Sequence, residues 1–228
     1  MENYKKNLEL LTKNHVYSKE MEHDACGVGL IASTEGKKSR AIVEYGIEAL
    51  KAVWHRGAVD ADGKTGDGAG IHVEIPKDFF IEKIQVTGHD YDNSEICVGM
   101  IFLPRNDYSA QESCKTIVES ELTKNNFSIY GWRQVPVNSK VLGEKALQTM
   151  PEIIQVLFKP NDPNLLDKNL ERKIYEIRKR IENKAFDASL NNFYICSISS
   201  KSIIYKGLYL AESISCLLYT SPSPRDSC

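Results

Sequence analysis

Apolar residues along this chain recur at two spacings, one typical of helices and the other typical of strands. After Ser39, which can cap a helix, apolar side chains lie three or four positions apart. They are Val43, Ile47, Leu50 and Trp54. This spacing predicts a helix that ends at residues 55–58 (His-Arg-Gly-Ala), where the glycine provides a C-terminal stop.

Alternating or continuous apolar segments predict the strands. A first strand begins at Cys26 and carries two glycines, and residues 69–75 alternate apolar with polar positions until Pro76. Further strands are predicted at 95–103, 128–135, 153–158, 192–199 and 202–210. Only Ser200 and Lys201 separate the last two, which predicts a β-hairpin.

Two further helices are predicted from apolar stripes. Residues 108–125 place Cys114, Ile117, Val118 and Leu122 on one face. Residues 164–185 form the longest predicted helix, with a stripe of Leu166, Leu170, Ile174, Ile177 and Ile181. Its polar face is predicted to be solvated surface and consists of Lys168, Glu171, Arg172, Arg178, Lys179 and Glu182.

Composition places the chain among ordinary globular proteins. Its 228 residues suffice to bury a core, and 42% of them are hydrophobic. The net charge of −2 supplies no basic field for nucleic acid or an anionic membrane. No apolar run approaches the roughly 18 residues of a membrane span, and residues 1–14 lack the apolar core of a secretory signal. We therefore expect a cytoplasmic protein.

The two ends of the chain differ from its middle. Residues 1–25 are polar, and we interpret them as a leader that masks Cys26; an ordinary flexible terminus is the alternative. Residues 216–228 are irregular and proline-rich, and resemble a translated adaptor sequence. We therefore expect a domain over 26–215, a non-native tail over 216–228, and a native continuation that is missing.

The cysteines suggest nucleophilic chemistry at one position. None of the six stands at the Cys-x-x-Cys spacing of a zinc site, and Cys97 and Cys196 lie in apolar segments as expected of buried thiols. Cleavage between Ala25 and Cys26 would give Cys26 a free α-amine. Because such an amine titrates near pH 7.7–8.0, it can accept the thiol proton. A small buried side chain is the alternative interpretation of Cys26.

A loop of unusual composition follows the first predicted helix. Residues 60–70 contain four glycines and three aspartates, which cannot pack a core but can form a hydrogen-bonded wall around a small polar ligand. We take Thr65, Gly66, Asp67 and Gly68 as candidate substrate-binding residues. A purely structural loop is the alternative.

Three motifs occur in a set order: residues 26–29 (Cys-Gly-Val-Gly), 55–58 (His-Arg-Gly-Ala) and 65–71 (Thr-Gly-Asp-Gly-Ala-Gly-Ile). Together with the segments at 192–197 and 205–207, they resemble the N-terminal class II glutamine amidotransferase domain of the glutamate synthases, in the large-subunit or ferredoxin-dependent form. The resemblance spans about residues 20–215. The first two motifs fit any class II amidotransferase, whereas the third and the middle segment favour glutamate synthase.

The resemblance implies an α+β fold, the N-terminal-nucleophile hydrolase sandwich of four αββα layers with two antiparallel sheets, here incomplete at its C-terminus. It implies that a propeptide is removed, that Cys26 attacks the amide of glutamine, and that Arg56 lies beside the nucleophile. A glutamyl thioester then releases ammonia and, with water, glutamate. In the complete enzyme the ammonia reaches 2-oxoglutarate at a flavin (FMN) site beside an iron–sulfur cluster. Electrons come from a small NAD(P)H-oxidising subunit or from ferredoxin.

Two of these residues have alternative interpretations. Arg56 could instead cap a helix C-terminus, and His55 could act as a base, although an N-terminal cysteine already supplies one. The family's Asn-Gly oxyanion pair and its Arg-Phe-Ser-Thr stretch do not occur in the sequence, and neither Asn191 nor Asn192 precedes a glycine. We therefore expect this chain by itself to be inactive.

Two alternative functions differ in class from a glutamate synthase domain. One is the amidotransferase domain of another class II enzyme, similar to an amidophosphoribosyltransferase. The other is an inactive amidotransferase-like module that binds glutamine or a partner without chemistry. The retained Cys26, Arg56 and glycine loop favour the catalytic interpretation.

Cleavage of the leader is directly testable. Because Cys26 has no α-amine while it is bonded to Ala25, the active protein produced from the complete native gene should begin at Cys26. Intact-mass analysis of that protein measures its first residue. A chain that still begins at Met1 and nevertheless hydrolyses glutamine would contradict this mechanism.

Overall fold

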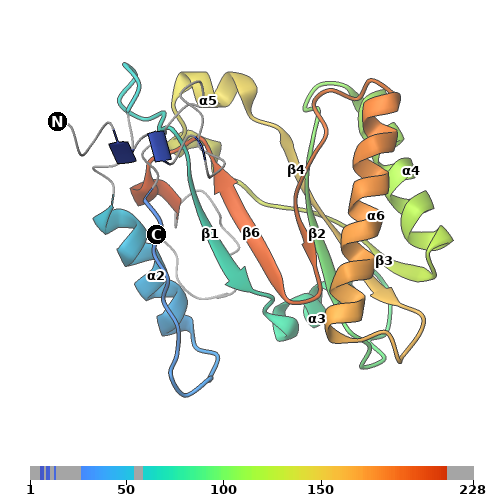
Figure 1. Ribbon diagram of the computed structural model, residues 1–228. Helices are drawn as coiled ribbons and strands as arrows, with labels where there is room; N and C mark the ends of the chain where they lie inside the picture. Colours follow the sequence, from blue (N-terminus) through green and yellow to red (C-terminus); the bar gives the residue numbers. More distant parts are fainter. Residues whose placement is uncertain (1–5, 8, 11–12, 14–26, 54–58, 215–228) are drawn as a thin grey trace.

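The computed structural model describes residues 6–7, 9–10, 13, 27–53 and 59–214 (Figure 1). Its strands form two antiparallel sheets, one with the order β3-β4-β2-β5 and the other with β1 and β6. The strands are β1 (Ala69–Glu74), β2 (Cys97–Leu103), β3 (Phe127–Gln134), β4 (Glu152–Pro160), β5 (Tyr194–Ser199) and β6 (Ser202–Gly207). The helices are α2 (Arg40–Ala52), α3 (Lys77–Val86), α4 (Tyr108–Lys124), α5 (Glu144–Thr149) and α6 (Asp167–Asp187), with short 3₁₀ turns η2 (Ser139–Val141) and η3 (Ala211–Ser213).

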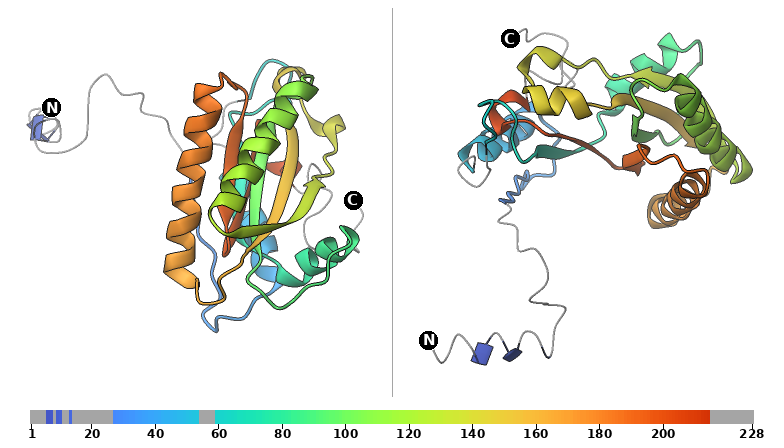
Figure 2. Two further views of the ribbon diagram at one scale, coloured as in Figure 1. Left: turned by 90° about the vertical axis from the view of Figure 1, so that its right-hand side faces the viewer. Right: turned by 90° about the horizontal axis from the view of Figure 1, so that it is seen from above.

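The elements are arranged as an α+β sandwich. From left to right, Figure 1 shows α2, the β1–β6 sheet, the four-stranded sheet, and then α4 with α6. The two further views place α4 and α6 side by side along the outer face of the four-stranded sheet (Figure 2). The predicted sandwich of two antiparallel sheets with flanking helices is thus confirmed.

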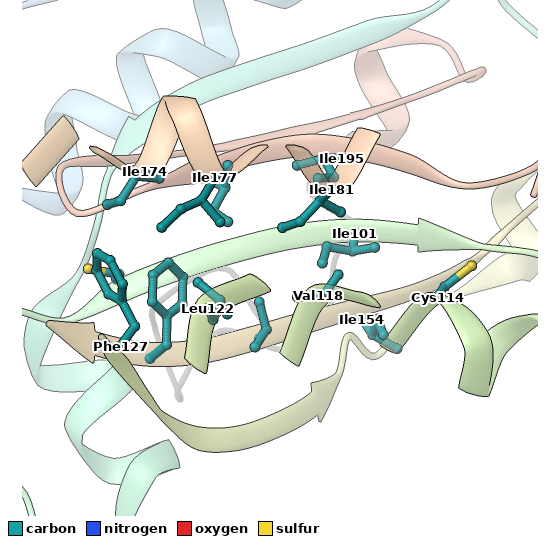
Figure 3. Packing of buried hydrophobic residues seen from close by; sticks show 14 of the residues in the cluster. Ile101, Cys114, Val118, Leu122, Phe127, Ile154, Ile174, Ile177, Ile181 and Ile195 are labelled. Atoms are coloured by element: carbon teal, nitrogen blue, oxygen red, sulfur yellow. The ribbon is translucent and has the colours of Figure 1, made fainter. Parts of the chain in front are cut away.

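The larger core lies between α4, α6 and the four-stranded sheet. Val118 and Leu122 of α4 meet Ile101 of β2 there, and both predicted helical stripes point into this space (Figure 3). Ile174, Ile177 and Ile181 of α6 are fully buried, whereas Leu166 precedes the helix and is half exposed. Because each such side chain contributes about 1.5–3 kcal/mol when buried, this layer anchors the fold.

A second core lies between the two sheets. It contains Ile203 and Tyr205 of β6, Val98 of β2, and Phe80 and Ile84 of α3. Helix α3 has no counterpart among the predicted elements, because it is short and only these two of its residues are buried.

The predicted hairpin over 192–210 is wrong. β5 pairs with β2 and β6 pairs with β1, so the chain crosses from one sheet to the other at Ser200 and Lys201. A two-residue hairpin favours Asn or Gly at the turn, and this dipeptide has neither. In place of a ladder, the Ser197 hydroxyl accepts a hydrogen bond from the Ile204 amide at 3.1 Å.

Two residues on the face of α6 that is predicted to be solvated, Glu171 and Arg178, instead bond to the neighbouring strand and to the crossing, so the prediction is wrong at these positions. The Glu171 carboxylate accepts hydrogen bonds from the Ser199 hydroxyl at 2.9 Å and from the amide and hydroxyl of Ser200, both at 2.7 Å. Arg178 donates to the carbonyl oxygen of Ile195 at 2.8 Å. These two side chains hold α6 against β5 and against the crossing, because their charged groups satisfy polar atoms at the sheet edge.

The predicted first strand is also absent from the described residues that follow Cys26. Residues 27–33 form no ladder with a described strand, and the side chains of Val28 and Leu30 are 91% and 90% exposed. A strand needs a neighbour to satisfy its backbone, and this segment instead runs beside α2, where Gly29 faces Ala49. In the part of the chain that the structure describes, no helix has the length and apolar character needed to cross a membrane.

The start of α2 is as predicted, since the Ser39 hydroxyl accepts a hydrogen bond from the amide of Ala41 at 3.1 Å. The helix ends earlier than predicted, at Ala52. The predicted stop at residues 55–58 lies outside the described residues.

The contact between Glu171 and the crossing should contribute measurably to stability. Glu171→Ala leaves partly buried polar groups of Ser199 and Ser200 without their acceptor, so we expect the free energy of unfolding to fall by about 1–3 kcal/mol. Urea denaturation measures this change. Glu176→Ala is the matched control, because its pair with Arg172 on the same helix is exposed and should matter by less than about 1 kcal/mol. Equal losses in the two variants would contradict the proposed contribution.

Candidate active site

The glycine-rich loop lies at the end of the smaller sheet where β1 begins and β6 ends (Figure 1). It closes on itself through a bridge between Val59 and Gly66 and a hydrogen bond from the Asp60 amide to the Thr65 carbonyl at 2.9 Å. Gly63 forms the tip with φ of +68°, a left-handed conformation that favours glycine. The loop is therefore a compact turn.

Asp62 forms the centre of this turn. Its Oδ1 accepts hydrogen bonds from the amides of Lys64 at 2.9 Å and Thr65 at 2.7 Å, and its Oδ2 accepts one from the Thr65 hydroxyl at 2.6 Å. These donors, above all the Thr65 hydroxyl, hold the pKa of Asp62 well below its usual range.

Several glycines of the site permit close backbone contacts. A Cβ atom on Gly66 would lie 2.8 Å from the carbonyl oxygen of Tyr209, and one on Gly70 would lie 2.8 Å from that of Tyr205. A Cβ atom on Gly143, just before α5, would collide with Asp62 and Thr65. Any side chain at these three positions would push the loop away from its supports.

The structure brings the four predicted substrate-binding residues together but gives them different surroundings. Thr65 is 7% exposed with its hydroxyl bonded to Asp62, and Gly66 is buried against Tyr209. Asp67 and Gly68 are exposed, and Gly68 has φ of +130°. The first pair fixes the loop and the second pair faces outward.

Cys26, His55 and Arg56 lie outside the described residues. The described segments next to them lie side by side. Residues 27–33 pass along α2 in the opposite direction, with Gly29 opposite Ala49. Gly27 and Val53 therefore lie at the same end of α2. That end is also the end of the sheet that carries the glycine loop (Figure 1).

The other thiols in the described region are poor nucleophiles. Cys97, Cys114 and Cys196 are buried. Burial raises the pKa of Cys114 and of Cys196 to about 11, and that of Cys97 well above its ordinary value. The thiols of all three are therefore held in the neutral form near pH 7.

Comparison with known families decides the class of the site. A sequence model described as "Glutamine amidotransferases class-II" matches residues 26–220. The chain belongs to the class II glutamine amidotransferases. The match begins at Cys26, and it includes the glycine loop and the crossing between the two sheets.

The amidotransferase is similar to curated proteins of two kinds. It is 53% identical, over 92% of its length, to the glutamate synthase [NADPH] large chain of Azospirillum brasilense. It is 37% identical over 90% of its length to the chloroplastic ferredoxin-dependent glutamate synthase of Spinacia oleracea, and 39% identical over 87% to the ferredoxin-dependent glutamate synthase of Pyropia yezoensis. The chain spans only 14%, 13% and 13% of the lengths of these proteins.

Sequence reasoning missed two residues that build the amidotransferase loop. In the sequence, Asp62 stands only as one of three aspartates in the loop, and Gly143 lies outside the motifs. The signal for Asp62 was its position before Lys64 and Thr65, because an aspartate often accepts hydrogen bonds from amides two and three residues later. No local signal marks Gly143, since its contact with the loop is formed only on folding.

The three buried thiols should react slowly in the folded amidotransferase. A thiol with a pKa of about 11 carries about 10²-fold less thiolate at pH 8 than an unfolded cysteine, and burial also blocks access. Timed iodoacetamide labelling with peptide mass analysis measures each site, and the same protein in urea is the control. Fast labelling of Cys114 or Cys196 without urea would contradict this expectation.

Proposed function

We propose that this chain is the glutamine-hydrolysing domain of a glutamate synthase, with Cys26 as its nucleophile. The single observation that carries the proposal is the family match that begins at Cys26. The 53% identity to a glutamate synthase large chain supports this enzyme over an amidophosphoribosyltransferase. The inactive module is disfavoured because Cys26, Arg56 and the loop are all retained.

In this proposal residues 1–25 are removed and the freed α-amine of Cys26 accepts the thiol proton. The thiolate attacks the side-chain amide carbon of glutamine, and the proton passes to the departing ammonia. Water then attacks the resulting thioester, releasing glutamate and restoring the thiol. Arg56 stabilises the thiolate with its permanent charge.

The glycine loop would form one wall of the glutamine site. In this proposal the exposed pair, Asp67 and Gly68, would meet the substrate, and the Asp67 carboxylate would suit the α-ammonium group of glutamine. Thr65 and Gly66 contribute from behind, because the Thr65 hydroxyl bonds to Asp62 and Gly66 packs on Tyr209.

The other groups of a glutamate synthase belong elsewhere in the complete protein. Among the described residues no group of three His, Cys, Asp or Glu side chains could hold a metal ion, so this region does not fit an iron–sulfur cluster. FMN would supply electrons for the reduction that makes glutamate from 2-oxoglutarate and ammonia. The electron donor would be a small NAD(P)H-oxidising subunit or ferredoxin. The compartment, the cytoplasm, stays a prediction.

Substitution in the complete enzyme tests the assignment. Cys26→Ala should abolish glutamine-dependent turnover, while turnover with added ammonia should survive because the synthase site is untouched. Arg56→Ala should impair the same half-reaction less severely, and Arg172→Ala, an exposed arginine of α6, should change neither rate. Steady-state assays with glutamine and with ammonium chloride measure both. Normal glutamine-dependent turnover in Cys26→Ala would refute the proposal.

A further inference from the structure

We propose that Asp62 is a positioning residue for glutamine binding, which locks the substrate-binding loop onto the start of α5. The inference rests on the proposed function, because it concerns the same site. The Oδ1 atom of Asp62 accepts hydrogen bonds from the amides of Lys64 and Thr65, and its Oδ2 accepts one from the Thr65 hydroxyl and lies against Gly143 at the start of α5.

The contact with Gly143 joins segments that are remote in sequence. Helix α5 begins after Gly143, a residue with no side chain that could cap the helix. The Asp62 carboxylate and the Thr65 hydroxyl pack directly against Gly143 there. The absence of a Cβ on Gly143 permits this approach, because such an atom would collide with both Asp62 and Thr65.

Asp62 acts on the substrate wall through Thr65. The Thr65 amide and hydroxyl are both held by Asp62, and the next residue, Gly66, lies flat against the backbone of Tyr209. Asp67 and Gly68 follow at once, so their position relative to β1 depends on this lock. A displacement of about 1 Å at a reacting or positioning group can cost about 10²-fold in rate.

A neighbouring pair offers a matched control. Asp60 accepts a hydrogen bond from Lys145 at 2.5 Å, so the same loop and the same helix are also joined by an ion pair. The Lys145 side chain is 71% exposed, and in the described contacts the Asp60 carboxylate accepts hydrogen bonds from Lys145 and from the Ala61 amide, not from Thr65. Exposed ion pairs of this kind contribute little to stability, so removing the Lys145 charge should leave the loop in place.

Two alkylating reagents separate positioning from folding. 6-Diazo-5-oxo-norleucine must bind as glutamine before it reacts with the nucleophile, whereas iodoacetamide needs only an exposed thiolate. In the complete enzyme, Asp62→Ala should slow labelling of Cys26 by the first reagent about 10–100-fold and change labelling by the second less than about twofold. Asp62→Asn keeps the Oδ1 acceptor and should restore part of the rate. Lys145→Met should match the wild type.

Each outcome is decisive. If Asp62→Ala slows both reagents equally, the residue serves stability alone and the inference fails; it fails also if neither rate changes. Should Asp62→Ala not fold, Thr65→Val, which removes only the hydroxyl bonded to Asp62, must show the same selective loss. Wild-type enzyme that the glutamine analogue does not label at Cys26 would overturn the proposed function and this inference with it.

Discussion

The passage of the chain from one sheet to the other at Ser200 and Lys201 determines most of this architecture. If β5 and β6 were a hairpin, all the strands would extend one sheet and the core between the sheets could not form. The crossing is held from outside by Glu171 of α6, which accepts hydrogen bonds from the Ser199 and Ser200 hydroxyls and from the Ser200 amide, a backbone group that a ladder would otherwise pair. The helical layer thus fixes the relation between the two sheets.

The way the two sheets are placed relative to each other also sets the position of the glycine loop. β6 runs from the crossing to Gly207, and its pairing with β1 places Ala69 opposite Gly207. The glycine loop enters at this end, where Gly66 rests on the backbone of Tyr209 just after β6. Loop conformation is then fixed by local bonds around Asp62, and its placement is fixed by the sheet. Rigid elements therefore carry a loop in which Thr65 and Gly66 are buried and the next two residues, Asp67 and Gly68, are exposed.

Sequence periodicity located the elements whose environment is uniform. The stripe of α6 and the continuous apolar run of β2 were predicted correctly because each buries a whole face or both faces. Which strands pair was not predictable in the same way, because the path of the chain between β5 and β6 depends on their pairing with the distant strands β2 and β1. Likewise, nothing in the sequence distinguishes Glu171 from a solvated residue, because its partner Ser200 comes beside it only on folding. Residues 27–33 resemble a strand, yet without a paired neighbour the pattern alone forms none.

The glycine loop shows the same division at the level of chemistry. Its composition correctly excluded a packed core, but composition does not distinguish glycines that admit a ligand from glycines that admit another backbone. Gly66 and Gly70 belong to the second kind, since a Cβ on either would strike the chain near Tyr209 or Tyr205. Gly68 differs, because glycine is favoured there by its positive φ of +130° and not by a close contact. A Cβ atom on Gly68 would meet nothing closer than 3.5 Å. A motif whose composition suggests one ligand-binding wall is thus, at Thr65, Gly66 and Gly70, a structural anchor.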